Sequence, residues 1–135
     1  MARILVAEDD LFIALAYEAV LIAEGHEVHS CENGKLALAA SSEFQPDLLL
    51  TDLVMPAMTG IELARALRGA PVRPDLPIVL VTAYPQEVLA AEPDLFDAVI
   101  RKPVSHEAVA ACVDELLQDA GRRRATAQAA KRVAE

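Results

Sequence analysis

Several short apolar runs in this sequence end in charged or hydroxyl side chains that could do chemistry. These residues are Glu8, Asp9, Asp52, Thr82 and Lys102. Carboxylates that lie close together repel one another at neutral pH, so three of them in one site need a cation. A hard divalent ion with oxygen ligands suits such a site, and Mg²⁺ is the first candidate. Magnesium beside a lysine binds phosphoryl oxygens, and one carboxylate could act as a nucleophile that forms an acyl phosphate.

Each of these residues also has an ordinary structural interpretation. Asp9 or Asp10 can cap the helix that follows, and Asp52 can cap a loop. Thr82 can be a turn residue, and Lys102 can be a surface base. Their position favours the functional interpretation, because ligands of an open α/β sheet bind beyond the carboxyl ends of its strands.

The elements that must position these side chains follow from the apolar pattern. Four runs are largely apolar, as strands covered on both faces require, and a fifth segment has an alternating pattern. The expected strands are residues 4–7, 27–31, 48–50, 78–81 and 98–100, and the expected helices are residues 11–24, 34–42, 60–68, 86–91 and a last helix that starts near Ser105. Asn33 is a candidate cap for the second helix. Strands that alternate with helices predict an α/β fold, a doubly wound five-stranded parallel sheet with right-handed crossovers.

Length, composition and charge narrow the classes of function. The chain has 135 residues, enough for one domain, and hydrophobic residues make up 54% of it, so a full core needs no metal or disulfide. No apolar run reaches the roughly 18 residues that a membrane span needs. Residues 118–135 carry a net charge of +3 and residues 1–117 carry −12, so the body is a poor partner for nucleic acid. The separated Cys31 and Cys112 are expected to be small core residues of a reduced, cytoplasmic protein.

Four motifs contain these strand ends: ILVAEDD, TDLVMPAMTG, VLVTAYP and IRKPV. Together they resemble the receiver domains of the response regulators of two-component signalling, over roughly residues 2–118. The resemblance implies the flavodoxin-like strand order 2-1-3-4-5. It also implies a receiver domain at residues 1–118, with a helical extension or a disordered tail at residues 119–135.

The resemblance assigns a role to each residue that matches the family's acidic positions. Asp52 would accept the phosphoryl group. Asp9 would bind Mg²⁺ directly, Glu8 would hold the ion through water, and Asp52 would also belong to the metal site. The backbone carbonyl of Val54 would be a further metal ligand.

Three more residues complete the site that the resemblance implies. Thr82 would donate a hydrogen bond to one phosphoryl oxygen, and Lys102 would pair with another. The bond between Lys102 and Pro103 is often cis in this family. Gly60 would permit the backbone turn that ends the loop after Asp52.

The chain departs from the family pattern at its switch residue. Receivers usually carry a tyrosine or phenylalanine three residues before the lysine, where this chain has Val99. Tyr84 lies two residues after Thr82 instead, which resembles a subset of receivers with the aromatic residue in the fourth loop. We therefore expect Val54, Ala83 and Tyr84 to modulate switching and the lifetime of the phosphorylated state.

The implied partners are a histidine kinase or a histidine phosphotransfer protein, and a downstream protein target. The first expected helix is apolar around much of its circumference, more than one sheet can cover, and exposed apolar area often marks an interface. Leu11 and Leu15 are the expected docking residues for the phosphodonor. Neither nucleic acid nor a membrane is an expected partner.

The expected function is that of a stand-alone receiver that is not a turnover enzyme, and three other functions compete with it. A receiver from a larger regulator or a hybrid kinase is the open alternative. An aspartyl-phosphate phosphatase of the haloacid dehalogenase type would carry a second aspartate where this chain has Val54. A flavin or nucleotide domain would need a glycine-rich or hydroxyl-rich phosphate loop where residues 8–10 are acidic and repel phosphate.

Overall fold

The computed structural model describes residues 1–69 and 74–134, with side chains described as far as residue 122. Five strands alternate with five helices in these ranges. The strands are β1 (Arg3–Ala7), β2 (Glu27–Cys31), β3 (Leu48–Asp52), β4 (Ile78–Thr82) and β5 (Ala98–Arg101). The helices are α1 (Leu11–Ala23), α2 (Gly34–Phe44), α3 (Gly60–Gly69), α4 (Pro85–Ala91) and α5 (His106–Ala134). The predicted alternation of strands and helices is confirmed.

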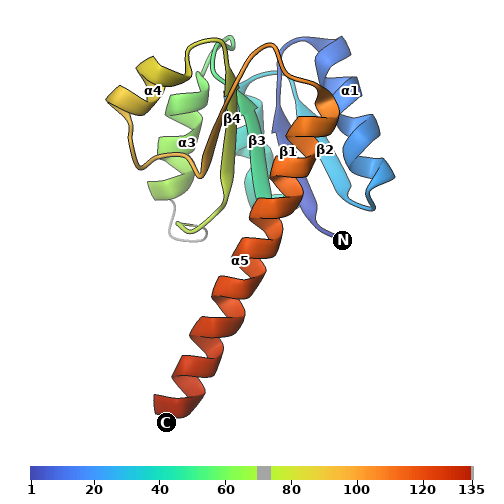
Figure 1. Cartoon of the computed structure of the whole chain (residues 1–135). Helices are drawn as coiled ribbons and strands as arrows, with labels where there is room; N and C mark the ends of the chain where they lie inside the picture. Colours follow the sequence, from blue (N-terminus) through green and yellow to red (C-terminus); the bar gives the residue numbers. More distant parts are fainter. Residues whose placement is uncertain (70–73, 135) are drawn as a thin grey trace.

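All strand pairs are parallel, and the predicted order is confirmed as β2-β1-β3-β4-β5. Helices α1 and α5 cover one face of the sheet, and α2 and α3 cover the other, with α4 beside α3 (Figure 1). The register pairs Ala7 with Thr51, and Thr82 with Arg101. Because β1, β3, β4 and β5 are parallel neighbours, their carboxyl ends lie together along one side of the sheet, which is called the carboxyl-end edge below.

Two separate apolar layers hold the helices to the sheet. Side chains of β1, β3 and β4 alternate between the layers, so that Ile4 and Leu50 face α1 and α5, whereas Leu5 and Leu49 face α2 and α3. This alternation explains why these strands are apolar at successive positions. Cys31 is buried, Cys112 is partly buried, and both thiols are free.

Side-chain caps fix where the first two helices begin. Asp10 Oδ1 accepts hydrogen bonds from the backbone N–H groups of Phe12 and Ile13, at 2.9 and 3.2 Å. Asn33 Oδ1 accepts a hydrogen bond from the backbone N–H of Leu36 at 2.8 Å, as predicted. Because Asp10 caps α1, the neighbouring Asp9 carboxylate is left for another role.

Helix α5 is one continuous helix that leaves the body of the protein and projects beyond the amino-terminal ends of the strands (Figure 1). The domain boundary at residue 118 stays a prediction. Among residues 1–69 and 74–134, no helix combines the length and the apolar character that a membrane span requires.

Candidate functional site

Three carboxylates gather at the carboxyl-end edge of the sheet. Oxygen atoms of Glu8, Asp9 and Asp52 all lie within 4.8 Å of one another. Glu8 and Asp9 follow β1, and Asp52 is the last residue of β3, which pairs with β1. Glu8 is buried, Asp52 is partly buried and Asp9 is exposed, so the cluster runs from the interior to solvent.

Burial raises the pKa of Glu8 to about 7, with a smaller contribution from the Asp52 carboxylate. A hydrogen bond from the Asp10 backbone N–H to Oε1 and the charge of Lys102 act in the opposite direction. Glu8 therefore holds a proton part of the time at neutral pH when no cation is bound. A bound divalent cation would favour the ionised carboxylate, so its binding would release that proton. The donor set of three carboxylates fits a hard cation better than a transition metal that prefers nitrogen or sulfur.

The two oxygens of Asp52 have different surroundings. Oδ1 accepts a hydrogen bond from the Leu53 backbone N–H at 2.8 Å and another from Lys102 Nζ at 3.1 Å. Among the residues that the structure describes, no donor binds Oδ2. The lone pairs of Oδ2 are therefore available to a cation or to an electrophile.

Thr82 and Lys102 lie on the other side of Asp52. The Thr82 side chain is buried at the end of β4, and its Oγ1 accepts a hydrogen bond from the Tyr84 backbone N–H at 3.0 Å. The hydroxyl proton of Thr82 is thus left for another acceptor. The Lys102 backbone N–H donates to the Thr82 carbonyl at 2.8 Å, which holds the two residues side by side, and the Lys102–Pro103 peptide is cis.

Gly60 is needed for a different reason from the one that the sequence suggested. Its backbone is not left-handed, and the residue with positive φ in this loop is Ala57, at 67°. Gly60 instead lies against β3, where a Cβ atom would be 2.2 Å from the Asp52 carbonyl oxygen. Its N–H donates to the Leu53 carbonyl at 2.8 Å and closes the loop of residues 53–59. Close approach of two backbones therefore requires glycine here.

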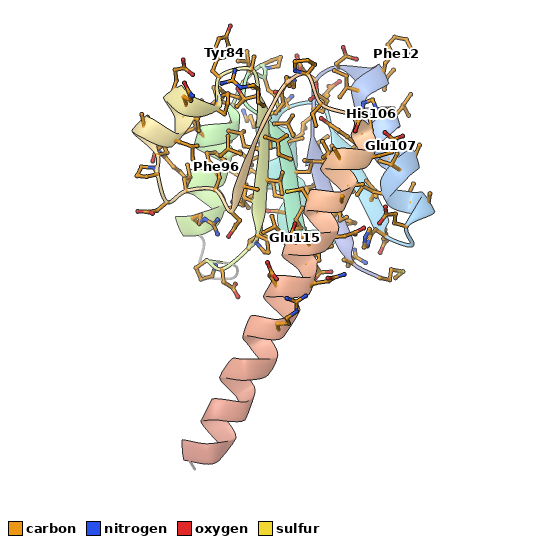
Figure 2. The ribbon with its side chains drawn as sticks, in the orientation of Figure 1. Phe12, Tyr84, Phe96, His106, Glu107 and Glu115 are labelled. Carbon is orange, nitrogen blue, oxygen red and sulfur yellow. The ribbon has the colours of Figure 1, made fainter. Side chains whose placement is uncertain are left out.

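The expected modulator residues lie on the surface around the cluster. The Val54 and Tyr84 side chains are 69% and 59% exposed, and Ala83 is also exposed. Figure 2 shows Tyr84 and Phe12 pointing outward at the same edge, Tyr84 near α4 and Phe12 at the start of α1. Val99 is partly buried within β5.

One buried residue near the site was missed by the sequence reasoning. Tyr17 of α1 is buried, and burial, together with the charges of Glu8 and Asp52, raises the pKa of its hydroxyl to about 12. Its ring meets the His106 ring edge-on, with 5.4 Å between the centroids. The only sequence signal for Tyr17 is its place in the apolar pattern of the first helix, which does not distinguish it from a core residue.

Residues 4–114 of the chain match the family of response regulator receiver domains. The chain belongs to this family. An uncharacterized response regulatory protein of Vibrio cholerae is 40% identical over 92 residues, which are 67% of this chain and 34% of that protein. This receiver therefore spans about a third of the length of that relative.

Solved receiver structures share the fold. A CheY-like receiver domain protein from Methanospirillum hungatei has a TM-score of 0.81 and 28% identity, with 91% of this chain and 98% of that chain covered. The response regulator TrrA from Thermotoga maritima, in complex with Mg²⁺ and BeF, has a TM-score of 0.75 and 30% identity, with 86% and 99% covered. The receiver described here therefore belongs to two-component signalling.

Proposed function

We propose that this receiver accepts a phosphoryl group on Asp52 in the presence of Mg²⁺ and signals through its surface. The observation that carries the proposal is the environment of Asp52. Lys102 and the Leu53 N–H bind Oδ1, Oδ2 is free among the described residues, and two more carboxylates lie within 4.8 Å. This arrangement supplies a nucleophilic oxygen on Asp52, the Lys102 ammonium group to pair with the transferred phosphoryl group, and a carboxylate site for a metal ion.

Asp9 and Asp52 would hold Mg²⁺ directly, Glu8 would hold it through water, and the Val54 carbonyl would be a further ligand. When bound, the ion neutralises charge on the carboxylates and on the incoming phosphoryl group. TrrA, which shares 30% identity with this chain, was solved with Mg²⁺ and BeF, and this similarity supports the assignment.

The remaining residues position the group that is transferred. Asp52 Oδ2 attacks phosphorus as the bond from phosphorus to the donor atom breaks and the donor leaves, while Lys102 pairs with one phosphoryl oxygen. Thr82 donates its hydroxyl proton to another oxygen, because the Tyr84 N–H already binds Oγ1. The protein acts here as an acceptor and not as a turnover enzyme on an external substrate.

A small acyl phosphate tests this function without a kinase. Wild-type protein incubated with acetyl phosphate should gain one phosphoryl group when Mg²⁺ is present and none when a chelator removes the ion. Intact-mass spectrometry measures the modified fraction. Equal modification with and without the chelator would show that the acidic cluster does not bind a metal needed for the transfer.

The natural donor in this proposal is a histidine kinase or a histidine phosphotransfer protein, and the output is a protein target. The acidic charge of residues 1–117 disfavours nucleic acid as a partner. Two free cysteines agree with a cytoplasmic location. The match to 34% of the Vibrio relative agrees with a receiver that acts alone and equally with a receiver within a larger regulator.

We expect the phosphodonor to dock on α1 beside the site. The Leu11 and Leu15 side chains are 66% and 49% exposed, next to the exposed Phe12. Leu11→Arg and Leu15→Arg should slow transfer from the donor protein by about tenfold or more, since each would place an unpaired charge in an apolar contact. Labelling by acetyl phosphate should not change. Leu89→Arg on α4 is the matched control, because Leu89 is exposed but lies on another helix. Equal loss in both assays would indicate misfolding and would remove the support for docking.

We also expect slow self-dephosphorylation. Hydrolysis needs a water molecule in line with the phosphorus, and we expect Val54 and Tyr84, each two residues beyond Asp52 or Thr82, to flank that approach. Valine cannot orient water, and the tyrosine ring can cover the site. Tyr84→Ala and Val54→Asn should therefore speed decay by a factor of about three to ten, and Tyr84→Phe should leave it unchanged. A decay time course measures this, and slower decay in Tyr84→Phe would mean that the hydroxyl assists hydrolysis.

A further inference from the structure

Helix α2 begins directly against the loop that follows Asp52. Gly34, the first residue of α2, is buried, and a Cβ atom there would be 2.6 Å from the Met58 carbonyl oxygen. The same Cβ would be 3.0 and 3.1 Å from Met58 Cβ and Cγ. The backbone of Gly34 is not left-handed, so glycine is required by this close contact between two segments far apart in the sequence.

Met58 lies in a loop that carries backbone strain. The preceding Ala57 has a φ of 67°, which is unfavourable for a residue with a Cβ. The Met58 N–H donates to the Pro56 carbonyl at 2.7 Å, and the loop closes through the bond from the Gly60 N–H to Leu53. Strained residues persist only when their surroundings hold them, and Gly34 packs against Met58, the residue that follows Ala57.

A second connection joins the same region to the acidic cluster. The Glu8 backbone N–H donates to the Cys31 carbonyl at 3.0 Å, at the end of β2 and just before α2. A groove of about 720 Å³ lies between α1, β2 and α2, and its walls include Glu8 and Asp9 as well as Leu36 of α2. The start of α2 therefore packs against the loop after β3, and it lines the same groove as the carboxylates after β1.

We propose that Gly34 is a positioning residue for the loop of residues 53–59, and that the first turn of α2 responds to occupancy of the Asp52 site. This inference rests on the proposed function. Among the described glycines, Gly34 and Gly60 are the two at which a Cβ atom would lie within 3.0 Å of a backbone atom. Gly60 closes the loop itself, whereas Gly34 lies on another element. A movement of the loop at Met58 therefore changes the surface against which Gly34 packs. If the loop and the first turn of α2 are coupled, a substitution at Gly34 that shifts the loop changes the affinity of the Asp52 site for its ligand. Because such coupling is reciprocal, a ligand bound at the Asp52 site also changes the conformation of the first turn of α2.

A series of glycine substitutions tests the proposal in the full chain. Gly34→Ala should raise the BeF₃⁻ concentration that half-saturates the protein in Mg²⁺ by about tenfold, which corresponds to a loss of only about 1.4 kcal/mol of binding free energy. Gly69→Ala is the matched control, because a Cβ at Gly69 meets no described atom within 4 Å. A second substitution, Met58→Gly, should restore much of the affinity to Gly34→Ala by letting the crowded peptide move.

Hydrogen exchange provides a readout that does not depend on the variant's stability. In wild-type protein, Mg²⁺ with BeF₃⁻ should change the exchange rates of amides in residues 33–38, as well as those in the loop. Unchanged rates in residues 33–38, or equal affinities of Gly34→Ala and Gly69→Ala, would overturn the proposal. If wild-type protein does not bind BeF₃⁻ at all, the proposed phosphoacceptor function fails instead.

Discussion

Asp52→Asn should take up no phosphoryl group from acetyl phosphate, a loss of at least about a hundredfold, while the protein stays folded. The amide that replaces the carboxylate can still accept the hydrogen bond from the Leu53 N–H. It offers no anionic oxygen for attack at phosphorus and gives Lys102 no charged partner. Intact-mass spectrometry in Mg²⁺ measures the uptake, and a thermal melt reports the fold.

Two asparagine variants serve as controls for this experiment. Asp94→Asn changes an exposed carboxylate outside the acidic cluster and should be labelled like wild type. Asp9→Asn keeps the nucleophile but removes a carboxylate from the cluster, so labelling should recover at higher Mg²⁺. Full labelling of Asp52→Asn would place the acceptor on another residue and would refute the central assignment.

Gly60→Ala should destabilise the protein by about 2–4 kcal/mol and lower Tm by about 10 °C. The added Cβ would lie 2.2 Å from the Asp52 carbonyl oxygen and 3.1 Å from Leu80 Cδ1. Backbone cannot move aside as a flexible side chain can, so either α3 or the end of β3 must shift. The end of β3 carries Asp52, so labelling by acetyl phosphate should fall with the stability.

The matched control for Gly60→Ala is Gly121→Ala, where the new Cβ meets no described atom within 4 Å. Chemical denaturation gives the free energy of unfolding of both variants, and the control should show no loss and a gain of up to about 1 kcal/mol, because alanine is more favourable than glycine inside a helix. If Gly60→Ala also lies within that range, the close packing of Gly60 on β3 is not important for stability.

The sheet was predictable because its strands are buried on both faces. Residues such as Leu48–Leu50 and Ile78–Val81 leave no polar face for solvent, and this pattern requires helices on both sides. The caps were partly predictable. Asn33 was identified correctly, whereas Asp9 and Asp10 could not be separated, because both precede α1 and only the geometry shows which carboxylate reaches the helix N–H groups.

The residues at the strand ends were predictable as a group, but their environments were not. Nothing in the sequence shows that Glu8 is buried enough to have a pKa of about 7 while its neighbour Asp9 is exposed. The roles of Gly34 and Gly60 depend on how closely two distant backbones approach, at Met58 and at Asp52. Such contacts are set by tertiary packing, which a local pattern of residue types does not record.

The projecting part of α5 has a mechanical consequence. Residues 119–134 rise by about 24 Å at about 1.5 Å per residue, well clear of the two apolar layers. A stiff rod held at one end acts as a lever arm. A tilt of about 10° where α5 packs on α1 would carry the far end of this segment through about 4 Å. Small adjustments between α1 and α5, too slight to alter the body of the receiver, would thus be magnified at a point distant from the acidic edge.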